Sequence, residues 1–301
     1  MARRPRRRRR SALRAFVAIA IVLVLLLGTV VGVVAVLNSQ SPPRPTTEVC
    51  FAGEGAEQVA LSPTQAKNAA LISAVTIRRG LPARAATIGL ATAMQESRLV
   101  NIDYGDRDSI GLFQQRPSQG WGTVEQIMDP VYSTGKFFDH LVKVDGYEDL
   151  PITEAAQAVQ RSGFPDAYAQ HEPRARAFAS ALTGYSEASL RCELHEAAPG
   201  TGDPQAVVAR VKRDFGKVPT KVATPQDGPT TVTIDASALS DDADRMGWAV
   251  AQWAVATAAE LGTTSVEVAD QRWDRESTDW SAGTTTLPAG SVRLTLAADE
   301  D

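Results

Sequence analysis

The sequence predicts a mainly α-helical domain followed by a small α+β domain, both placed after an N-terminal transmembrane helix. Three observations predict this fold class: a long uncharged apolar run near the start, a middle segment with helical periodicity, and a last third in which helical and alternating patterns mix. The 301 residues are enough for two domains with cores of their own.

Breaks in composition divide the chain into six segments. We expect a cytoplasmic basic tail at 1–14, a transmembrane anchor at 15–37, a linker at 38–48, a helical domain at 49–195, a second linker at 196–205 and a C-terminal domain at 206–301. Both linkers carry prolines among small or polar residues, which is typical of connecting segments.

The N-terminal segments predict a single-pass membrane protein. The first fourteen residues hold eight arginines and no acid, and residues 15–37 follow without a charge. About 20 apolar residues suffice for a helix that crosses the hydrocarbon core, and arginine clusters favour the cytoplasmic side. The run is longer than the core of a cleavable signal peptide. We therefore expect the later domains outside the cell membrane. A basic arm for nucleic acid and a twin-arginine export signal are the alternatives for the arginines.

The chain beyond the apolar run is acidic. Removing the eight tail arginines from the 31 Lys and Arg leaves 23, against all 35 Asp and Glu, so residues 38–301 carry a formal charge of −12. Such a surface argues against nucleic acid or anionic lipid as its partner.

The two cysteines, Cys50 and Cys192, both follow the apolar run. Two cysteines in an exported chain most often pair, and the chain-entropy treatment gives a loop of this length about 5 kcal/mol of stabilisation. We expect a disulfide that closes the ends of one domain; two separate buried thiols are the alternative.

The segment between the cysteines has the periodicity of helices and almost no alternation. Ser62 and Pro63 are typical of an N-cap and a first helical residue, and Gly80 is typical of a helix end. The expected helices here are 63–79, 82–96, 130–142, 153–161 and 165–182, with a glycine-rich loop at 104–122. In the C-terminal segment we expect helices at 204–215 and 241–261, the second of them amphipathic, and strands at 230–235, 266–268 and 291–296.

Glu96 is the candidate catalytic residue because it ends a helix whose preceding turns are nearly all apolar. Cleavage of a glycosidic bond requires protonation of the leaving oxygen, and burial raises the pKa of a carboxyl group so that it keeps its proton near neutral pH. Most glutamates are solvated surface residues, so the neighbouring residues must support the assignment.

Glu96 and Ser97, followed after a short polar loop by Gly-Leu-Phe-Gln at 111–114, resemble the motifs of the lysozyme-like soluble lytic transglycosylase superfamily. Members of that superfamily carry a catalytic Glu-Ser pair and a Gly-Leu-Met-Gln block, in which phenylalanine here replaces methionine. The resemblance covers about residues 50–190 and looks like the version seen in actinobacterial and phage-derived wall hydrolases. It implies a lysozyme-like fold for the domain at 49–195.

The resemblance also implies roles for individual residues, with Glu96 as the sole acid and base. The implied substrate-binding residues are Ser97, Ser109, Phe113, Gln114, Gln115, Gln160 and Tyr168. The family's third block, Ala-Tyr-Asn before Ala-Gly, falls near 158–163, where the tyrosine and asparagine are missing. Either Gln160 takes over the sugar contact or Tyr168 reaches back from the next helix. The alternative for Phe113 is a core position at a helix start.

The loop also contains Asp103, Asp106 and Asp108. A two-carboxylate glycosidase needs a second acid at a fixed separation from the first. The resemblance implies instead a single glutamate, with the substrate's acetamido group and hydroxyl as internal nucleophiles and a 1,6-anhydro product. We therefore interpret the aspartates as turn formers or solvated charges.

We expect no metal and no cofactor. His140, His171 and His195 lack metal-ligand spacing. The C-terminal segment, with Trp253 in a Gly-Trp-Ala-Val-Ala-Gln-Trp run, resembles the tail domain of some actinobacterial wall proteases, but no histidine follows His195. We expect a non-catalytic domain whose tryptophans lie in the core rather than on a glycan-binding platform.

The sequence therefore predicts a membrane-anchored enzyme that cleaves the MurNAc–GlcNAc backbone of peptidoglycan, as a lytic transglycosylase or a muramidase. The alternative is a catalytically inactive peptidoglycan-binding or scaffold protein of the cell envelope. The expected partners are glycan strands, the membrane through the N-terminal helix, and envelope proteins through the C-terminal domain, but no nucleic acid.

Overall fold

The computed structural model describes residue 28 and residues 47–164, 166–226 and 228–298. The basic tail lies outside the described residues, as does the apolar run expected to be the anchor, except for Gly28. No helix within the described ranges has the length and apolar character to cross a membrane. The compact unit that begins at Thr47 is described here by itself.

This unit is a mixed α/β structure with antiparallel sheets, in agreement with the mixed composition expected of the two domains together. Its α-helices, within the described residues, are α2 (Pro63–Arg78), α3 (Ala83–Ser97), α4 (Val124–Met128), α5 (Pro130–Leu141), α6 (Ile152–Gln160), α7 (Glu172–Leu182), α8 (Pro204–Phe215) and α9 (Ala243–Leu261). Its strands are β1 (Val49–Ala52), β2 (Val59–Leu61), β3 (Leu190–Glu193), β4 (Thr220–Ala223), β5 (Thr231–Asp235), β6 (Thr263–Val268), β7 (Gln271–Asp274), β8 (Trp280–Ala282) and β9 (Ser291–Leu296).

Local signals place most helices where the sequence predicts them. The Ser62 hydroxyl accepts a hydrogen bond from the backbone N–H of Gln65, and the side-chain oxygen of Gln65 accepts one from the backbone N–H of Ser62, so α2 begins with a complete capping box. Gly80 follows the helix at φ 64°, as expected of a terminating glycine. By contrast, α7 begins at Glu172, later than expected, because the short 3-10 helix Ala169–His171 precedes it.

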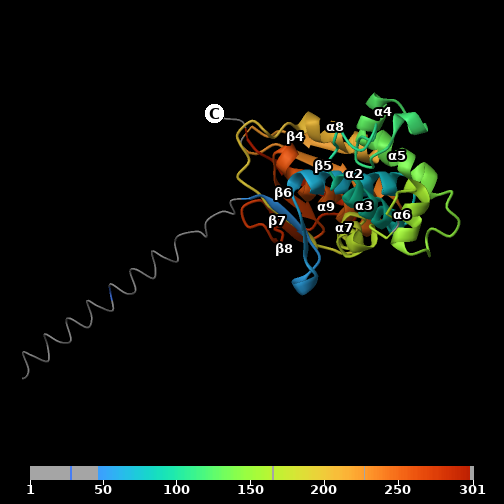
Figure 1. Ribbon diagram of the computed structural model, residues 1–301. Helices are drawn as coiled ribbons and strands as arrows, with labels where there is room; N and C mark the ends of the chain where they lie inside the picture. Colours follow the sequence, from blue (N-terminus) through green and yellow to red (C-terminus); the bar gives the residue numbers. More distant parts are fainter. Residues whose placement is uncertain (1–27, 29–46, 165, 227, 299–301) are drawn as a thin grey trace, which may run out of the picture. The chain divides into compact units, whose positions relative to one another are not determined.

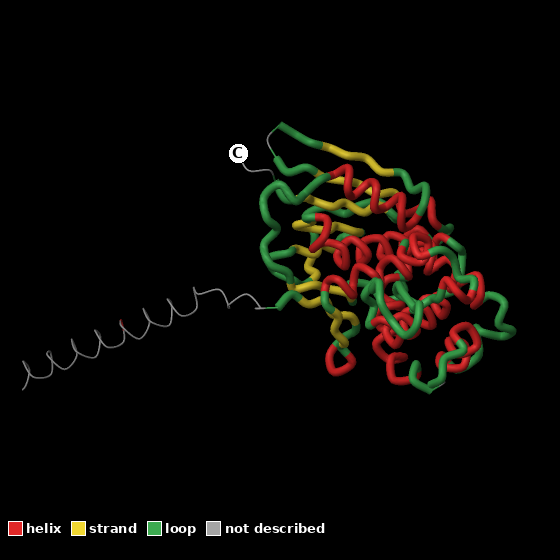
Figure 2. The backbone as a smooth tube through the Cα atoms, turned by 45° about the horizontal axis from the view of Figure 1, so that its top comes forward, coloured by secondary structure: helices red, strands yellow, loops and turns green. Residues whose placement is uncertain are grey.

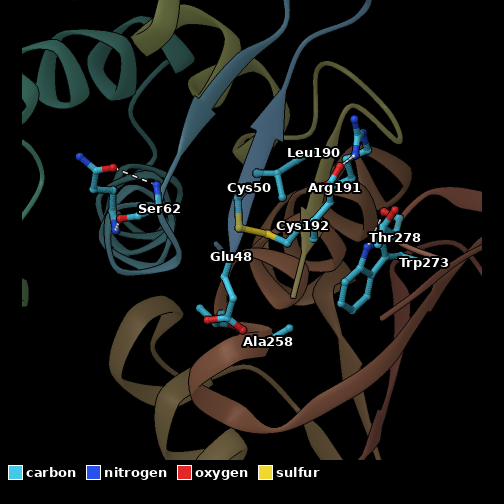
Figure 3. Close-up of a disulfide and its surroundings, with 12 residues drawn as sticks. Glu48, Cys50, Ser62, Leu190, Arg191, Cys192, Ala258, Trp273 and Thr278 are labelled. Carbon is cyan, nitrogen blue, oxygen red and sulfur yellow. Dashed lines mark hydrogen bonds and ion pairs between the residues drawn. A yellow bond between two sulfur atoms is a disulfide. The ribbon is translucent and has the colours of Figure 1, made fainter. Parts of the chain in front are cut away.

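A three-stranded sheet in the order β2-β1-β3 joins the two ends of the helical segment, where the sequence predicts no strands. Each strand has only three or four residues, too few to show an alternating pattern. Cys50 and Cys192 are directly opposite each other in the β1–β3 pair, and their side chains form the predicted disulfide (Figure 3). The two half-cystines are separated by 142 positions in the sequence.

Removal of this disulfide is expected to destabilise the fold strongly. Replacing both Cys50 and Cys192 by alanine frees a long loop in the unfolded chain, and the expected loss is about 3–5 kcal/mol. Urea unfolding would measure it, with reduced wild-type protein as the control that should match the double variant. An unchanged unfolding midpoint would contradict the prediction.

The larger sheet is antiparallel throughout, with the strand order β4-β5-β9-β6-β7-β8. In Figures 1 and 2 its strands gather on one side of the unit and most helices on the other. The helix α9 lies between them, packed against β6 and β9 on one side and against α2 and α7 on the other. Every residue from Met246 to Ala258 is therefore buried, and α9 is not the amphipathic helix that the sequence predicts.

Polar contacts also join the residues that precede the segment at 196–205 to the residues that follow it. The buried Gln252 of α9 accepts hydrogen bonds from the backbone N–H groups of Ser189 and Leu190, and its amide group donates to the carbonyl oxygens of Ala181 and Ser186. One side chain of the C-terminal segment thus satisfies four backbone groups between α7 and β3. The boundary between the two domains remains a prediction.

Candidate active site

Glu96 lies in the last turn of α3 and is half-buried. Nearly every face of the helix is buried, because it packs against α2, α5, α6 and α7. It ends at Arg98, whose left-handed conformation (φ 55°) turns the chain away just beyond the glutamate. The carboxyl group therefore emerges at the edge of the apolar core.

Glu96 faces a pocket of about 430 Å³ with a mostly polar lining. Of the residues that the sequence singles out, Ser109, Gln114, Gln115 and Gln160 also line this pocket. Sequence reasoning missed seven other lining residues: Arg107, Arg116, Gln119, Trp121, Arg161, Ser162 and Gly163. Their only signal is their position beside the two motifs, in segments whose conformation the local pattern does not predict.

Tyr168 is fully buried and donates a hydrogen bond of 2.7 Å from its hydroxyl to Oε1 of Glu96. It comes from the segment between α6 and α7, so it reaches the glutamate from a distant part of the sequence. Burial, and secondarily the neighbouring Glu96 carboxylate, raise the pKa of the Tyr168 hydroxyl well above its ordinary value. Tyr168 therefore keeps its proton and acts as a donor.

The pKa of Glu96 is raised above the ordinary value for a glutamate. Burial is the largest cause, because desolvation disfavours the charged carboxylate. The hydrogen bond from Tyr168 and the amide of Gln160 act in the opposite direction and offset part of the effect. The net result favours the protonated form, which a proton donor needs.

A tight turn at 111–114 forms the wall of the pocket after the glutamate. Gly111 has φ 79°, and a Cβ atom there would lie 2.9 Å from the carbonyl oxygen of Ile127, so the position requires glycine. Two backbone hydrogen bonds of 3.0 Å between Ile110 and Gln115 close the turn. Ser97 fastens it to α3 by donating a 2.7 Å hydrogen bond to the carbonyl oxygen of Leu112.

Gln114 and Gln115 have different environments in this turn. Gln114 has a left-handed backbone (φ 47°), and its amide donates to the carbonyl oxygen of Tyr104 at 3.3 Å. Gln115 is almost fully buried, and its amide donates to the carbonyl oxygen of Ser133. Gln114 is thus the more accessible of the two for a ligand.

Phe113 does not line the pocket in the way the resemblance implies. Its side chain is fully buried and stacks on Phe137, with ring centroids 4.6 Å apart. Its carbonyl oxygen accepts a 2.8 Å hydrogen bond from the side chain of Gln160. Phe113 therefore holds Gln160 through its backbone, while its ring fills the core beneath the site, as the alternative interpretation proposed.

The loop aspartates occupy three different environments. Asp106 lines the pocket, but its side chain is 94% exposed. Its Oδ2 is 3.9 Å from Nε of Arg107, which is a weak contact between two exposed groups. Asp108 accepts hydrogen bonds from Nε of Arg116 and the backbone N–H of Ser118, which hold the pKa of its carboxyl far below the usual range. Asp103 is exposed and lies outside the lining. Glu96 is therefore the one half-buried carboxyl among the described lining residues.

The histidines serve in packing and hydrogen bonding. His171 is within 2.9 Å of the Gln95 side chain, next to the catalytic candidate on α3, and the ring of His140 packs against that of Trp121 in a tilted arrangement. Within the described ranges, no group of three or more His, Cys, Asp or Glu side chains is arranged to hold a metal ion. In the C-terminal segment Trp248, Trp253 and Trp273 are buried, so these tryptophans belong to the core.

A scan of the chain against models of known protein families gives no match, and neither does a search of curated proteins. The assignment of a function therefore depends on the motifs and on the geometry of the pocket.

Proposed function

We propose that this protein is a membrane-anchored peptidoglycan-cleaving enzyme with a lysozyme-like domain, a lytic transglycosylase or a muramidase. The observation that carries the proposal is the half-buried Glu96, with its raised pKa and its hydrogen bond from Tyr168, in a polar pocket beside the Gly111 turn. The substrate would be the MurNAc–GlcNAc backbone, outside the cell membrane.

In this mechanism Glu96 transfers its proton to the glycosidic oxygen as the bond to the anomeric carbon breaks. The resulting carboxylate then removes a proton from the group that attacks the anomeric carbon. Attack by the sugar's own 6-hydroxyl gives a 1,6-anhydro end, and attack by water gives a reducing end. Tyr168 holds the carboxyl oxygen in place throughout both steps.

The lining suits a sugar because it offers amide and hydroxyl groups together with a flat aromatic ring. Gln114, Gln160 and Ser109 supply hydrogen-bonding groups, and Trp121 supplies an apolar face. The tyrosine missing from the family's third block has a counterpart in space, because Tyr168 reaches Glu96 from the following segment. Gln160 lines the pocket while Tyr168 reaches Glu96 from beneath it, so both interpretations of that block find support.

The mechanism requires one carboxyl group only. Asp106 is the second acid of the pocket, but its side chain is almost fully solvated and lies 3.9 Å from the exposed Nε of Arg107, so little holds it in one position. We therefore favour the substrate-assisted chemistry of a transglycosylase over a two-carboxylate mechanism.

Product analysis tests this function directly. The full-length protein would be incubated with purified sacculi and the soluble products analysed by mass spectrometry. Anhydro-ended muropeptides would identify a transglycosylase, and reducing ends a muramidase. Binding to sacculi without products would favour the second candidate, a wall-binding or scaffold protein, for which the altered third block is the supporting observation.

Tyr168→Phe is expected to move the pH dependence of cleavage. The variant removes a donor that stabilises the Glu96 carboxylate, so the pKa of Glu96 should rise further. Because the protonated form is the active one, the alkaline limb of kcat/KM should shift to higher pH. The maximal rate should fall by about tenfold, since the carboxyl group loses its positioning contact.

The matched control is Tyr147→Phe, which alters a buried tyrosine that does not line the pocket. Its pH profile should coincide with that of the wild-type protein. An alkaline limb that stays in place or moves to lower pH in Tyr168→Phe would contradict the assigned roles.

A further inference from the structure

A second pocket of about 520 Å³ adjoins the one that contains Glu96. The two pockets share four lining residues, Gln119, Trp121, Gln160 and Arg161. A polymer bound across Glu96 in the first pocket could therefore place a substituent in the second pocket.

The charge of the second pocket is opposite to that of the surrounding chain. Lys143 and Arg161 line it, and no Asp or Glu is among the described residues that do so. Both side chains are exposed, and within the described part of the chain neither forms an ion pair. By contrast, Arg116 in the first pocket is bound to Asp108. Two unpaired cations thus face one cavity in a segment whose formal charge is −12.

The rings of His140 and Trp121 line the second pocket without adding to its charge. His140 lies with its ring centroid 4.4 Å from that of Trp121. Burial, and then the ammonium group of Lys143, lower the pKa of His140, and Arg161 acts weakly in the same direction. His140 is therefore neutral at pH 7, and the positive charge of the pocket comes from Lys143 and Arg161.

The backbone holds Arg161 in a defined place. The residue ends α6 in the left-handed conformation (φ 52°), and its N–H donates a 2.8 Å hydrogen bond to the carbonyl oxygen of Gln157. The side chain of Gln157 in turn donates to the carbonyl oxygen of Ser162. Such a conformation is unfavourable for a residue with a Cβ atom, and the hydrogen bonds on both sides of Arg161 maintain it.

We propose that this Lys143–Arg161 pocket binds a free carboxylate of the peptide carried by muramic acid, next to the sugar at Glu96. The inference rests on the proposed function and narrows its substrate to glycan that bears peptides. An arginine fork matches a carboxylate with two parallel hydrogen bonds, and a lysine adds a point charge. The lactyl ether of muramic acid attaches the peptide beside the glycan backbone, and the second pocket adjoins the one that contains Glu96.

Binding measurements test the proposal separately from catalysis. Full-length protein carrying Glu96→Gln, which should not consume the ligand, would be titrated with soluble glycan fragments whose peptides keep their free carboxylates and with the same fragments after those carboxylates have been converted to amides. The readout is the ratio of the two dissociation constants. The fragments with free peptide carboxylates should bind about tenfold more tightly than the amidated ones, as expected for two partly exposed ion pairs.

In the same background, Lys143→Gln with Arg161→Gln should bring this ratio close to one. Lys212→Gln with Lys217→Gln removes the same charge from exposed positions outside both pockets and should leave the ratio unchanged. Arg161→Lys, which keeps the charge without the fork, should restore part of the preference.

A ratio near one before the pocket is altered, or a preference that survives the double substitution, would overturn the inference while leaving the cleavage experiment to decide the proposed function. Tighter binding of a phosphate-bearing wall polymer than of peptide-bearing glycan, lost in the double variant, would reassign the pocket to phosphate. Because binding is measured without turnover, absence of cleavage by the wild-type protein would overturn the function but not this result.

Discussion

Glu96→Gln should reduce glycan cleavage by at least about 10³-fold and leave the fold intact. The amide has nearly the shape of the carboxyl group but cannot give up a proton, and general acid catalysis contributes roughly 10²–10⁴-fold. The loss should be near the upper end of that range, since Glu96 is the one half-buried carboxyl in the described lining of the pocket. Release of soluble muropeptides from sacculi would measure it.

The same variant should be as stable as the wild-type protein at pH 7, or slightly more stable. A carboxyl group whose pKa is raised by folding favours the folded state at low pH and opposes it once the pH passes that pKa. The uncharged amide avoids this cost, so we expect the melting temperature to rise by about 2 °C. A lower melting temperature would indicate that loss of activity reflects unfolding.

Asp106→Asn is the matched control for the catalytic assignment, because it removes the other carboxylate of the pocket with an equally conservative change. It should retain cleavage within about tenfold, as expected for a solvated rim residue. If Asp106→Asn were as inactive as Glu96→Gln, a two-carboxylate mechanism would replace the one proposed. Full activity of Glu96→Gln would remove the basis of the enzymatic function.

A chain that ends at residue 196 should fail to fold cooperatively. Such a truncation removes α9, which covers α2 and α7, and it also removes Arg210, whose guanidinium donates to the carbonyl oxygen of Lys67. The cores on both sides of the boundary are continuous, so the helices that position Glu96 would expose apolar surface. Heat capacity scans and resistance to protease would show the loss.

A point variant tests the same dependence without a truncation. Gln252→Leu leaves several backbone groups between Ala181 and Leu190 without their side-chain partner. Each unsatisfied buried group costs about 1–3 kcal/mol, so we expect a loss of about 4 kcal/mol and a melting temperature lower by roughly 10 °C. Gln205→Leu, at an exposed position of α8, should have almost no effect.

These results would decide whether the segment at 49–195 is a domain in its own right. A truncated chain with a sharp unfolding transition and wild-type cleavage would support the boundary that the composition predicts. Parallel loss of stability and activity would show that the C-terminal segment is part of the catalytic fold, whatever further partners it binds.

The sequence alone determined the features that depend on neighbouring residues. The capping residues of α2, the glycine at the end of that helix and the periodicity of α5 and α8 predict these helices to within a residue or two. The Glu96–Ser97 pair and the Gly111 turn mark the candidate site for the same reason, since they form a local motif in which the glycine adopts φ 79°. The disulfide was predicted from two cysteines in a chain that the sequence predicts to be exported.

Only the tertiary structure decided the features that join distant residues. The short strands β1 and β3 gain their stability from pairing across more than 130 positions, which no local pattern can show. The side chain of Phe113 turns into the core because Phe137 packs beneath it, while Tyr168 and Gln160 enter the site. The raised pKa of Glu96 is likewise a result of packing, because desolvation depends on how many elements surround the carboxyl group rather than on its neighbours in the sequence.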